Sequence, residues 1–162
     1  MLREESQPVK KKKKKSSSET QRCVPYLLYK DVGKALAWLK KAFGFTELGD
    51  RFEGPDGTIQ HAAMTIPEGG EVIMMGCPGP KYKNPKKLGV ATQMLYIYVD
   101  QVDKHFARAR KAKPKVLNKL EDTFYGDRRY GVEDPEGHQW FFAQRIREVS
   151  SEEMQRAAAS QR

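Results

Sequence analysis

The three histidines of this 162-residue chain are the side chains best suited to bind a metal ion or move a proton. His61 lies in the middle of a predicted strand, where its ring could contact a ligand, although a lone strand histidine is more often structural. His105 lies among charged residues of a predicted helix, and we expect it to be solvated. His138 follows a turn at 134–137 and is expected to hold that turn.

The two cysteines belong to no arrangement typical of covalent catalysis. Cys77 precedes Pro78 and has no visible activating neighbour, so we do not expect it to be a nucleophile. The sequence also shows no Ser-His-Asp or Cys-His arrangement, no phosphate-binding glycine loop and no carboxylate pair with evident spacing. Cys23 and Cys77 lack the spacing of a metal site and are too few for a disulfide scaffold, which favours reduced thiols in a cytoplasmic protein.

Hydrophobic periodicity predicts a chain of alternating strands and helices. The predicted helix 31–44 begins at the N-cap Asp31 and ends at Gly44. The predicted helix 101–112 has Asp100 at its cap. Strands are predicted at 24–30, 45–57, 58–66, 71–76, 94–100, 115–125, 128–134 and 138–146.

The order of these elements repeats once along the chain. At an offset of 69 residues, Tyr29-Lys30-Asp31 aligns with Tyr98-Val99-Asp100, and each tripeptide closes a strand and opens a helix. At a nearly equal offset of 68, Pro67-Glu68-Gly69 aligns with Pro135-Glu136-Gly137. The sequence therefore predicts two βαβββ repeats. The predicted parts are a disordered basic arm at 1–22, one domain at 23–150 with repeats at about 23–77 and 92–148, a connector at 77–92, and a short helix or tail at 151–162.

The segment YGDRRYGVEDPEGHQWFFAQ at 125–144 resembles the signature of the glyoxalase/bleomycin resistance/dioxygenase (vicinal oxygen chelate) superfamily. The stretches VPYLLYKDVGKALAWLKKAFGF, DGTIQHAAMTI and MLYIYVDQVD are similar to a branch grouped with phosphonate-operon B-like proteins. This resemblance spans about residues 23–150. It implies an α+β fold in which two βαβββ modules form a cupped eight-stranded mixed sheet, usually in a homodimer. It implies the fold more strongly than the function, because one fold hosts unrelated activities.

Metal-dependent members of this superfamily bind a divalent ion through four His, Glu or Gln side chains in the cup, and the ion polarises vicinal oxygens of the substrate. The resemblance places these positions on Val24, Met74, Met94 and Phe141. Valine and phenylalanine have no donor atom, and methionine sulfur is a soft ligand. A shift of one residue brings in only Cys23 and Gln93, fewer than the three ligands that metal catalysis usually needs. We therefore expect no metal and no other cofactor.

Alternation along the strands places aromatic, methionine and leucine side chains together in this cup. Tyrosine offers a flat apolar surface with a hydroxyl, and methionine adapts its shape to a ligand. The residues expected to contact a small molecule are Tyr26, Leu28, His61, Met74, Met94, Tyr96, Tyr98, Tyr125, Arg128, Gln139 and Phe141. Some of them could instead pack the dimer, and Arg128 could instead pair with Asp127. Trp140 and Phe142, on the opposite face, are expected in the core under a helix.

These features favour a homodimeric protein that binds or sequesters a small, partly aromatic molecule. The first alternative is a metal-dependent lyase or dioxygenase of the same superfamily, so whether the chain is an enzyme stays open. The second alternative is a nucleic-acid-associated protein acting through Lys10–Lys15, which could neutralise phosphates. Those six lysines supply most of the net charge of +9, and the arm lacks aromatic residues for base stacking. No apolar run reaches the roughly 18 residues needed to cross a membrane, so no membrane partner is expected.

Overall fold

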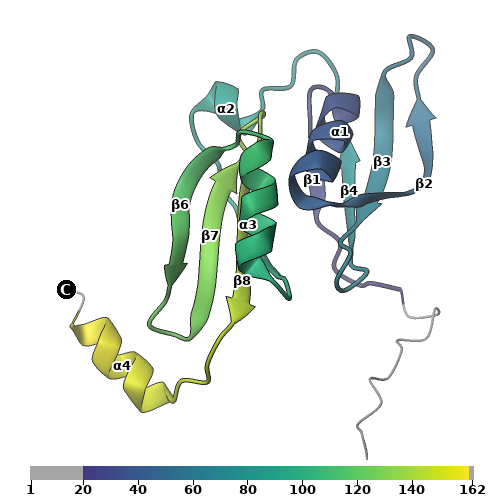
Figure 1. Cartoon of the computed structure of the whole chain (residues 1–162). Coiled ribbons are helices and arrows are strands. Elements are labelled where there is room, and N and C mark those ends of the chain that lie inside the picture. Colours follow the sequence, from purple (N-terminus) through teal and green to yellow (C-terminus); the bar gives the residue numbers. More distant parts are fainter. Residues whose placement is uncertain (1–19, 161–162) are drawn as a thin grey trace, which may run out of the picture.

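The computed structural model describes residues 20–160 (Figure 1). Its elements are β1 (Tyr26–Leu28), α1 (Val32–Phe43), β2 (Thr46–Glu53), β3 (Ile59–Thr65), β4 (Val72–Gly76), α2 (Pro85–Leu88), β5 (Met94–Tyr98), α3 (Val102–Lys111), β6 (Lys115–Asp122), β7 (Asp127–Glu133), β8 (Gln139–Arg145) and α4 (Ser151–Ala159). The order βαβββ occurs twice, which confirms the predicted α+β fold. The lysine run of the predicted arm lies outside the described residues, so a nucleic-acid role stays a prediction.

Each module forms its own four-stranded mixed sheet. The strand order is β1-β4-β3-β2 in the N-terminal sheet and β5-β8-β7-β6 in the C-terminal sheet. In both sheets the first strand pairs in parallel with the last, and the other pairs are antiparallel. The eight strands are thus divided between two sheets instead of forming one continuous sheet, because β1 and β5 are edge strands that do not pair with each other within the described chain.

One hydrophobic core joins the two modules. It is formed by one face of each sheet together with α1 and α3, which lie beside each other near the centre of the molecule (Figure 1). Phe43 of α1 crosses between the modules, since its ring centroid lies 4.5 Å from that of Phe142 and 5.4 Å from that of Trp140 in β8. Trp140 and Phe142 are fully buried, as the sequence predicted. The face of each sheet that points away from this core is called its outer face below.

The first predicted helix cap is confirmed and the second is wrong. Asp31 Oδ1 accepts a hydrogen bond from the backbone N–H of Lys34 at 2.9 Å, and Gly44 ends α1 in the left-handed conformation. In α3 the cap position is Gln101 instead of Asp100, without a side-chain cap bond. The backbone N–H of Val102 donates to the side chain of Gln144 in β8, so a neighbouring strand supplies the acceptor.

The turn that precedes β8 fastens the second module to the first. The carboxylate of Glu136 accepts hydrogen bonds from the backbone N–H groups of Lys30 and Asp31 at the start of α1. It also accepts one from the side chain of Asn84, the N-cap of α2, a helix that the sequence analysis missed within the connector. His138 contributes more than the predicted support of the turn, since its Nε2 lies 2.9 Å from the carbonyl oxygen of Leu28 in β1.

His105 is buried, so the expectation that it is solvated was wrong. It shares the inner face of α3 with Val102 and Ala109, which lie three and four residues away, and its Nδ1 is 2.6 Å from the hydroxyl of Tyr130. The charged neighbours that suggested exposure, such as Lys104 and Arg108, are themselves exposed, whereas the imidazole turns into the core. Burial lowers the pKa of His105 to about 4, so the ring is neutral near pH 7.

This buried ring should make the protein sensitive to mild acid. Its pKa is lower in the folded state than the ordinary value of about 6.5 in the unfolded state. The unfolded chain therefore binds the proton first, and stability present above about pH 6.5 is lost as the pH falls towards about 4. Between about pH 7 and about pH 5, we expect urea titrations to show the wild-type free energy of unfolding falling by about 2 kcal/mol more than that of His105→Gln. Equal decreases in the free energy of unfolding of the two proteins would contradict the lowered pKa of His105.

Candidate functional site

The outer face of the N-terminal sheet is apolar and exposed. Along β1, Leu27 is buried in the core, whereas Tyr26 and Leu28 point outward with exposed fractions of 48% and 38%. The strand register places Tyr26 beside Met74, and it aligns Leu28, Gly76 and His61 across β1, β4 and β3. Four predicted ligand contacts, Tyr26, Leu28, His61 and Met74, therefore lie together on this face.

Tyr26 and His61 supply the polar groups of this face. The hydroxyl of Tyr26 lies 2.8 Å from His61 Nδ1, and Phe52 of β2 places its ring centroid 5.7 Å from that of His61. Gly76 makes the contact possible, because a Cβ atom there would lie 2.7 Å from the Tyr26 hydroxyl. The result is an aromatic surface with one hydroxyl and one imidazole that can exchange hydrogen bonds with a ligand.

The outer face of the C-terminal sheet carries a second aromatic surface. The register aligns Met94 with Gln139 and Tyr96 with Phe141, so these predicted contacts lie together. Phe141 packs closely against Gly131, where a Cβ atom would come within 2.6 Å of its ring.

An arginine covers part of this second surface. The guanidinium carbon of Arg129 lies 5.7 Å from the ring centroid of Phe141 and 5.8 Å from that of Tyr125, within the range of cation–π attraction. Arg128, the arginine that the sequence analysis proposed, does not share this surface. Its guanidinium binds the carboxylates of Asp103 in α3 and Asp122 in β6.

Asp127 anchors the tyrosines of this surface, a role that the sequence analysis missed. Its carboxylate is almost fully buried, and Oδ2 accepts hydrogen bonds from the hydroxyls of Tyr96 at 3.0 Å and Tyr98 at 2.9 Å. Arg145 Nε lies 2.8 Å from Asp127 Oδ1 and forms an ion pair without hydrogen-bond alignment. The arginine that pairs with Asp127 is therefore Arg145 and not Arg128. Burial, with hydrogen bonds to Tyr125 and Asp127, raises the pKa of Tyr96 well above its ordinary value. Tyr96 therefore stays protonated and keeps donating.

The two surfaces do not meet within one chain, because each lies on the side of its sheet that faces away from the shared core. The side chains at the family's metal positions do not fit a hard or borderline divalent ion, since Val24, Met74, Met94 and Phe141 offer no oxygen or nitrogen donor. Over residues 20–160, no three His, Cys, Asp or Glu side chains gather as a candidate metal site. In the same part of the chain, no helix is long and apolar enough to cross a membrane.

Comparisons with known proteins agree with this architecture. Residues 21–142 match the Glyoxalase/Bleomycin resistance protein/Dioxygenase superfamily. Uncharacterized proteins of Mycobacterium bovis and Mycobacterium tuberculosis are 39% identical over 143 residues, covering 85% of this chain and 91% and 82% of theirs.

Solved structures show the same similarity. TioX from Micromonospora sp. ML1 has a TM-score of 0.63 and 33% identity, covering 78% of this chain and 100% of its own. A glyoxalase-related enzyme from Clostridium phytofermentans has a TM-score of 0.61 at 10% identity, with 81% and 99% covered, and shows the fold alone.

Proposed function

Because the chain belongs to the glyoxalase/bleomycin resistance/dioxygenase superfamily, and because its two aromatic surfaces are separated within one chain, we propose that it is a homodimeric small-molecule-binding protein. The N-terminal sheet of one protomer faces the C-terminal sheet of its partner, and each pair of outer faces encloses one cup. The cup binds a planar, partly hydrophobic molecule without a metal ion.

The observation that carries this proposal is the exposure of large apolar side chains on both outer faces. Tyr26 and Phe52 are 48% and 64% exposed on the N-terminal sheet, and Met94 and Tyr98 are 54% and 53% exposed on the C-terminal sheet. Monomeric soluble proteins rarely leave large contiguous apolar patches in water. A second protomer covers both patches at once, because a two-fold axis places the N-terminal outer face of each protomer against the C-terminal outer face of its partner.

The chemistry of the two surfaces indicates the kind of ligand. Tyrosine and phenylalanine rings stack on a flat molecule, and Met74 and Met94 adapt to its edges. Tyr26 and His61 on one side, and Arg129 on the other, supply a small number of polar contacts for a hydroxyl, carbonyl or acidic group. We also propose, from the sequence resemblance, that the chain belongs to the branch grouped with phosphonate-operon B-like proteins.

A metal-dependent lyase or dioxygenase needs polar ligands that these surfaces do not provide. His61 is the one imidazole on either outer face of the described sheets, and its Nδ1 is engaged by Tyr26. Three ligands are the usual minimum for a catalytic metal. The donor set therefore supports binding without metal more than it supports metal-assisted chemistry.

Methyl spectra of the methionines test the proposal directly. Met74 and Met94 lie on different outer faces, whereas Met64 and Met75 are fully buried and serve as internal controls. With 2-naphthol as the probe, we expect a dimer by sedimentation and simultaneous shifts of the Met74 and Met94 signals at one dissociation constant. A monomer, or a shift confined to one of the two faces, would overturn the composite cup.

A further inference from the structure

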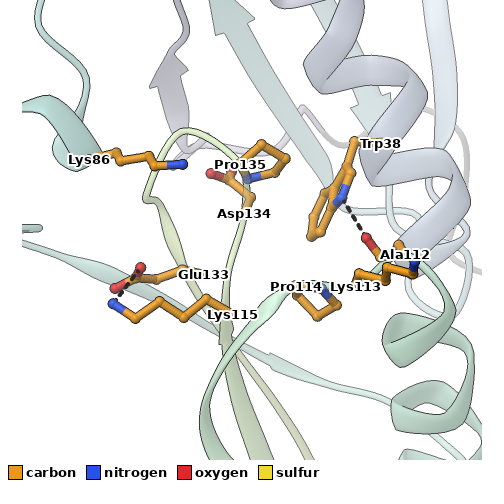
Figure 2. Close-up of a pocket in the computed structure, with 9 residues that line it drawn as sticks. All are labelled: Trp38, Lys86, Ala112, Lys113, Pro114, Lys115, Glu133, Asp134 and Pro135. Atoms are coloured by element: carbon orange, nitrogen blue, oxygen red, sulfur yellow. Dashed lines mark hydrogen bonds and ion pairs between the residues drawn. The ribbon is translucent and has the colours of Figure 1, made fainter.

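A second cavity, of about 360 Å³, lies at the seam between the modules and shares no residue with the predicted cup (Figure 2). It lies between α1, the connector helix α2, the segment that leads into β6 and the segment that follows β7. Its lining residues are Trp38, Lys86, Ala112, Lys113, Pro114, Lys115, Glu133, Asp134 and Pro135. Its volume is in the range of small-molecule sites in proteins.

The cavity carries an excess of available positive charge. Lys115 pairs with Glu133 at 3.0 Å, but neither Lys86 nor Lys113 has a carboxylate within ion-pair distance among residues 20–160. The carboxylate of Asp134 is buried and turned away, since it accepts four hydrogen bonds from within the fold. The ammonium groups of Lys86 and Lys113 are therefore free to pair with an anion.

The other walls of the cavity are flat and apolar. Figure 2 shows the indole of Trp38 extending from α1, with Pro135 to one side of it and Pro114 below it. Its Nε1–H donates to the carbonyl of Ala112 at 3.3 Å, which fixes the orientation of the ring. Pro114 and Pro135 also line the cavity. A planar ring can stack on the indole while its acidic substituent reaches the lysines.

The backbone at Lys113 gives an independent reason to assign a role to this cavity. Lys113 has a φ of 54° and is the one non-glycine residue with positive φ in the described part of the chain. It follows the end of α3 and donates its N–H to the carbonyl of Arg110, at a helix-end position where glycine is strongly preferred. Strained non-glycine residues tend to persist at functional sites, and here the strained residue supplies one of the free ammonium groups.

We propose that this cavity binds a small carboxylate or phosphate carried on a planar ring. The ring stacks against Trp38, and the anionic group pairs with Lys86 and Lys113. The proposal is independent of the cup, because the cavity is complete within one chain.

Nitrogen-edited NMR spectra of the intact protein test it. The chain has two tryptophans, and Trp38 lines the cavity, whereas Trp140 is fully buried with its indole N–H bonded to Asp134, so the Trp38 indole signal is the one to follow. We expect benzoate and phenyl phosphate to shift the Trp38 indole signal with dissociation constants on the order of 1 mM, and neutral benzamide to leave it in place. The anion with the lower dissociation constant shows whether the cavity prefers a carboxylate or a phosphate.

Variants separate binding from folding. Lys113→Gly removes the amine and relieves the positive φ, so it should weaken anion binding while raising the melting temperature. The double variant Lys86→Ala/Lys113→Gly should weaken binding by ~10-fold or more. Lys87→Ala, in the same helix but outside the cavity, and Tyr98→Ala, on an outer face, should leave the shift unchanged. The proposal is overturned if benzamide binds as well as benzoate, or if the double variant binds benzoate as the wild type does.

Discussion

Mixing two binding-deficient variants, one altered on each sheet, should restore binding of 2-naphthol in roughly a quarter of the cups. Tyr26→Ala removes a ring from the N-terminal outer face, and Tyr98→Ala removes one from the C-terminal outer face. Each homodimer then has two damaged cups, and we expect its affinity to fall by ~10-fold or more. After exchange, half of the dimers combine one chain of each kind. Such a dimer has one unaltered cup and one cup that lacks both tyrosines.

Isothermal titration of the exchanged mixture measures the number of restored sites, and native mass spectrometry confirms that mixed dimers have formed. The matched control mixes Tyr98→Ala with Met94→Ala, both on the C-terminal sheet, because every cup in that mixture keeps one alteration. Mixed dimers that bind no better than the parent variants would place the ligand within a single chain and reject the composite cup.

The sequence predicted the repeat and the strand faces because these follow from local rules. Asp31 and Gly44 delimit α1 through a side-chain cap and a positive φ, which depend on residues close in the chain. Tyr26 and Leu28 share a face because side chains alternate along any strand. The same rules could also have found α2, since Asn84, Pro85 and Gly89 are ordinary start and stop signals.

The interactions that the sequence did not predict join residues far apart in the chain. Asp127 accepts hydrogen bonds from tyrosines 31 and 29 residues away, and no local pattern identifies that carboxylate as their acceptor. Whether Arg128 or Arg129 faces the cup depends on which face of β7 is buried, since successive side chains of a strand point to opposite faces. Tyr130 is buried in the core and Arg128 reaches Asp103 of α3. Arg129 therefore lies on the outer face.

The separation of the two cup surfaces also follows from the whole fold. Both sheets bury their inner faces against the same pair of helices, so their outer faces point away from the common core. The βαβββ order alone allows the modules to meet edge to edge instead. The choice depends on residues such as Phe43, whose ring packs against the sheet of the other module.

Asp134→Asn should lower the free energy of unfolding by about 3–5 kcal/mol, the largest loss we expect from a single conservative change. Asp134 Oδ2 accepts hydrogen bonds from the hydroxyl of Tyr29 at 2.7 Å and from Trp140 Nε1 at 3.1 Å. Oδ1 accepts from the backbone N–H groups of Glu136 and His138. An amide has only one oxygen, so its NH₂ group would face two donors in a buried site, whichever way it is turned.

The loss should be large because Asp134 joins the modules as well as stabilising its own turn. Tyr29 directly follows β1 of the N-terminal module, 105 residues before Asp134. Burial together with the Asp134 carboxylate raises the pKa of its hydroxyl well above the ordinary value. That hydroxyl therefore remains a donor, and it loses its acceptor when the amide turns its NH₂ towards it.

Urea unfolding of matched variants measures the effect. Asp122→Asn changes a carboxylate that is 55% exposed and paired with Arg128, and it should cost less than about 1 kcal/mol. Tyr29→Phe removes one of the four donors and should cost about 1–2 kcal/mol, between the other two variants. A total stability of about 5–15 kcal/mol is usual for one domain, so Asp134→Asn should remove a large fraction of it. Equal losses for Asp134→Asn and Asp122→Asn would show that the buried carboxylate does not hold the two modules together.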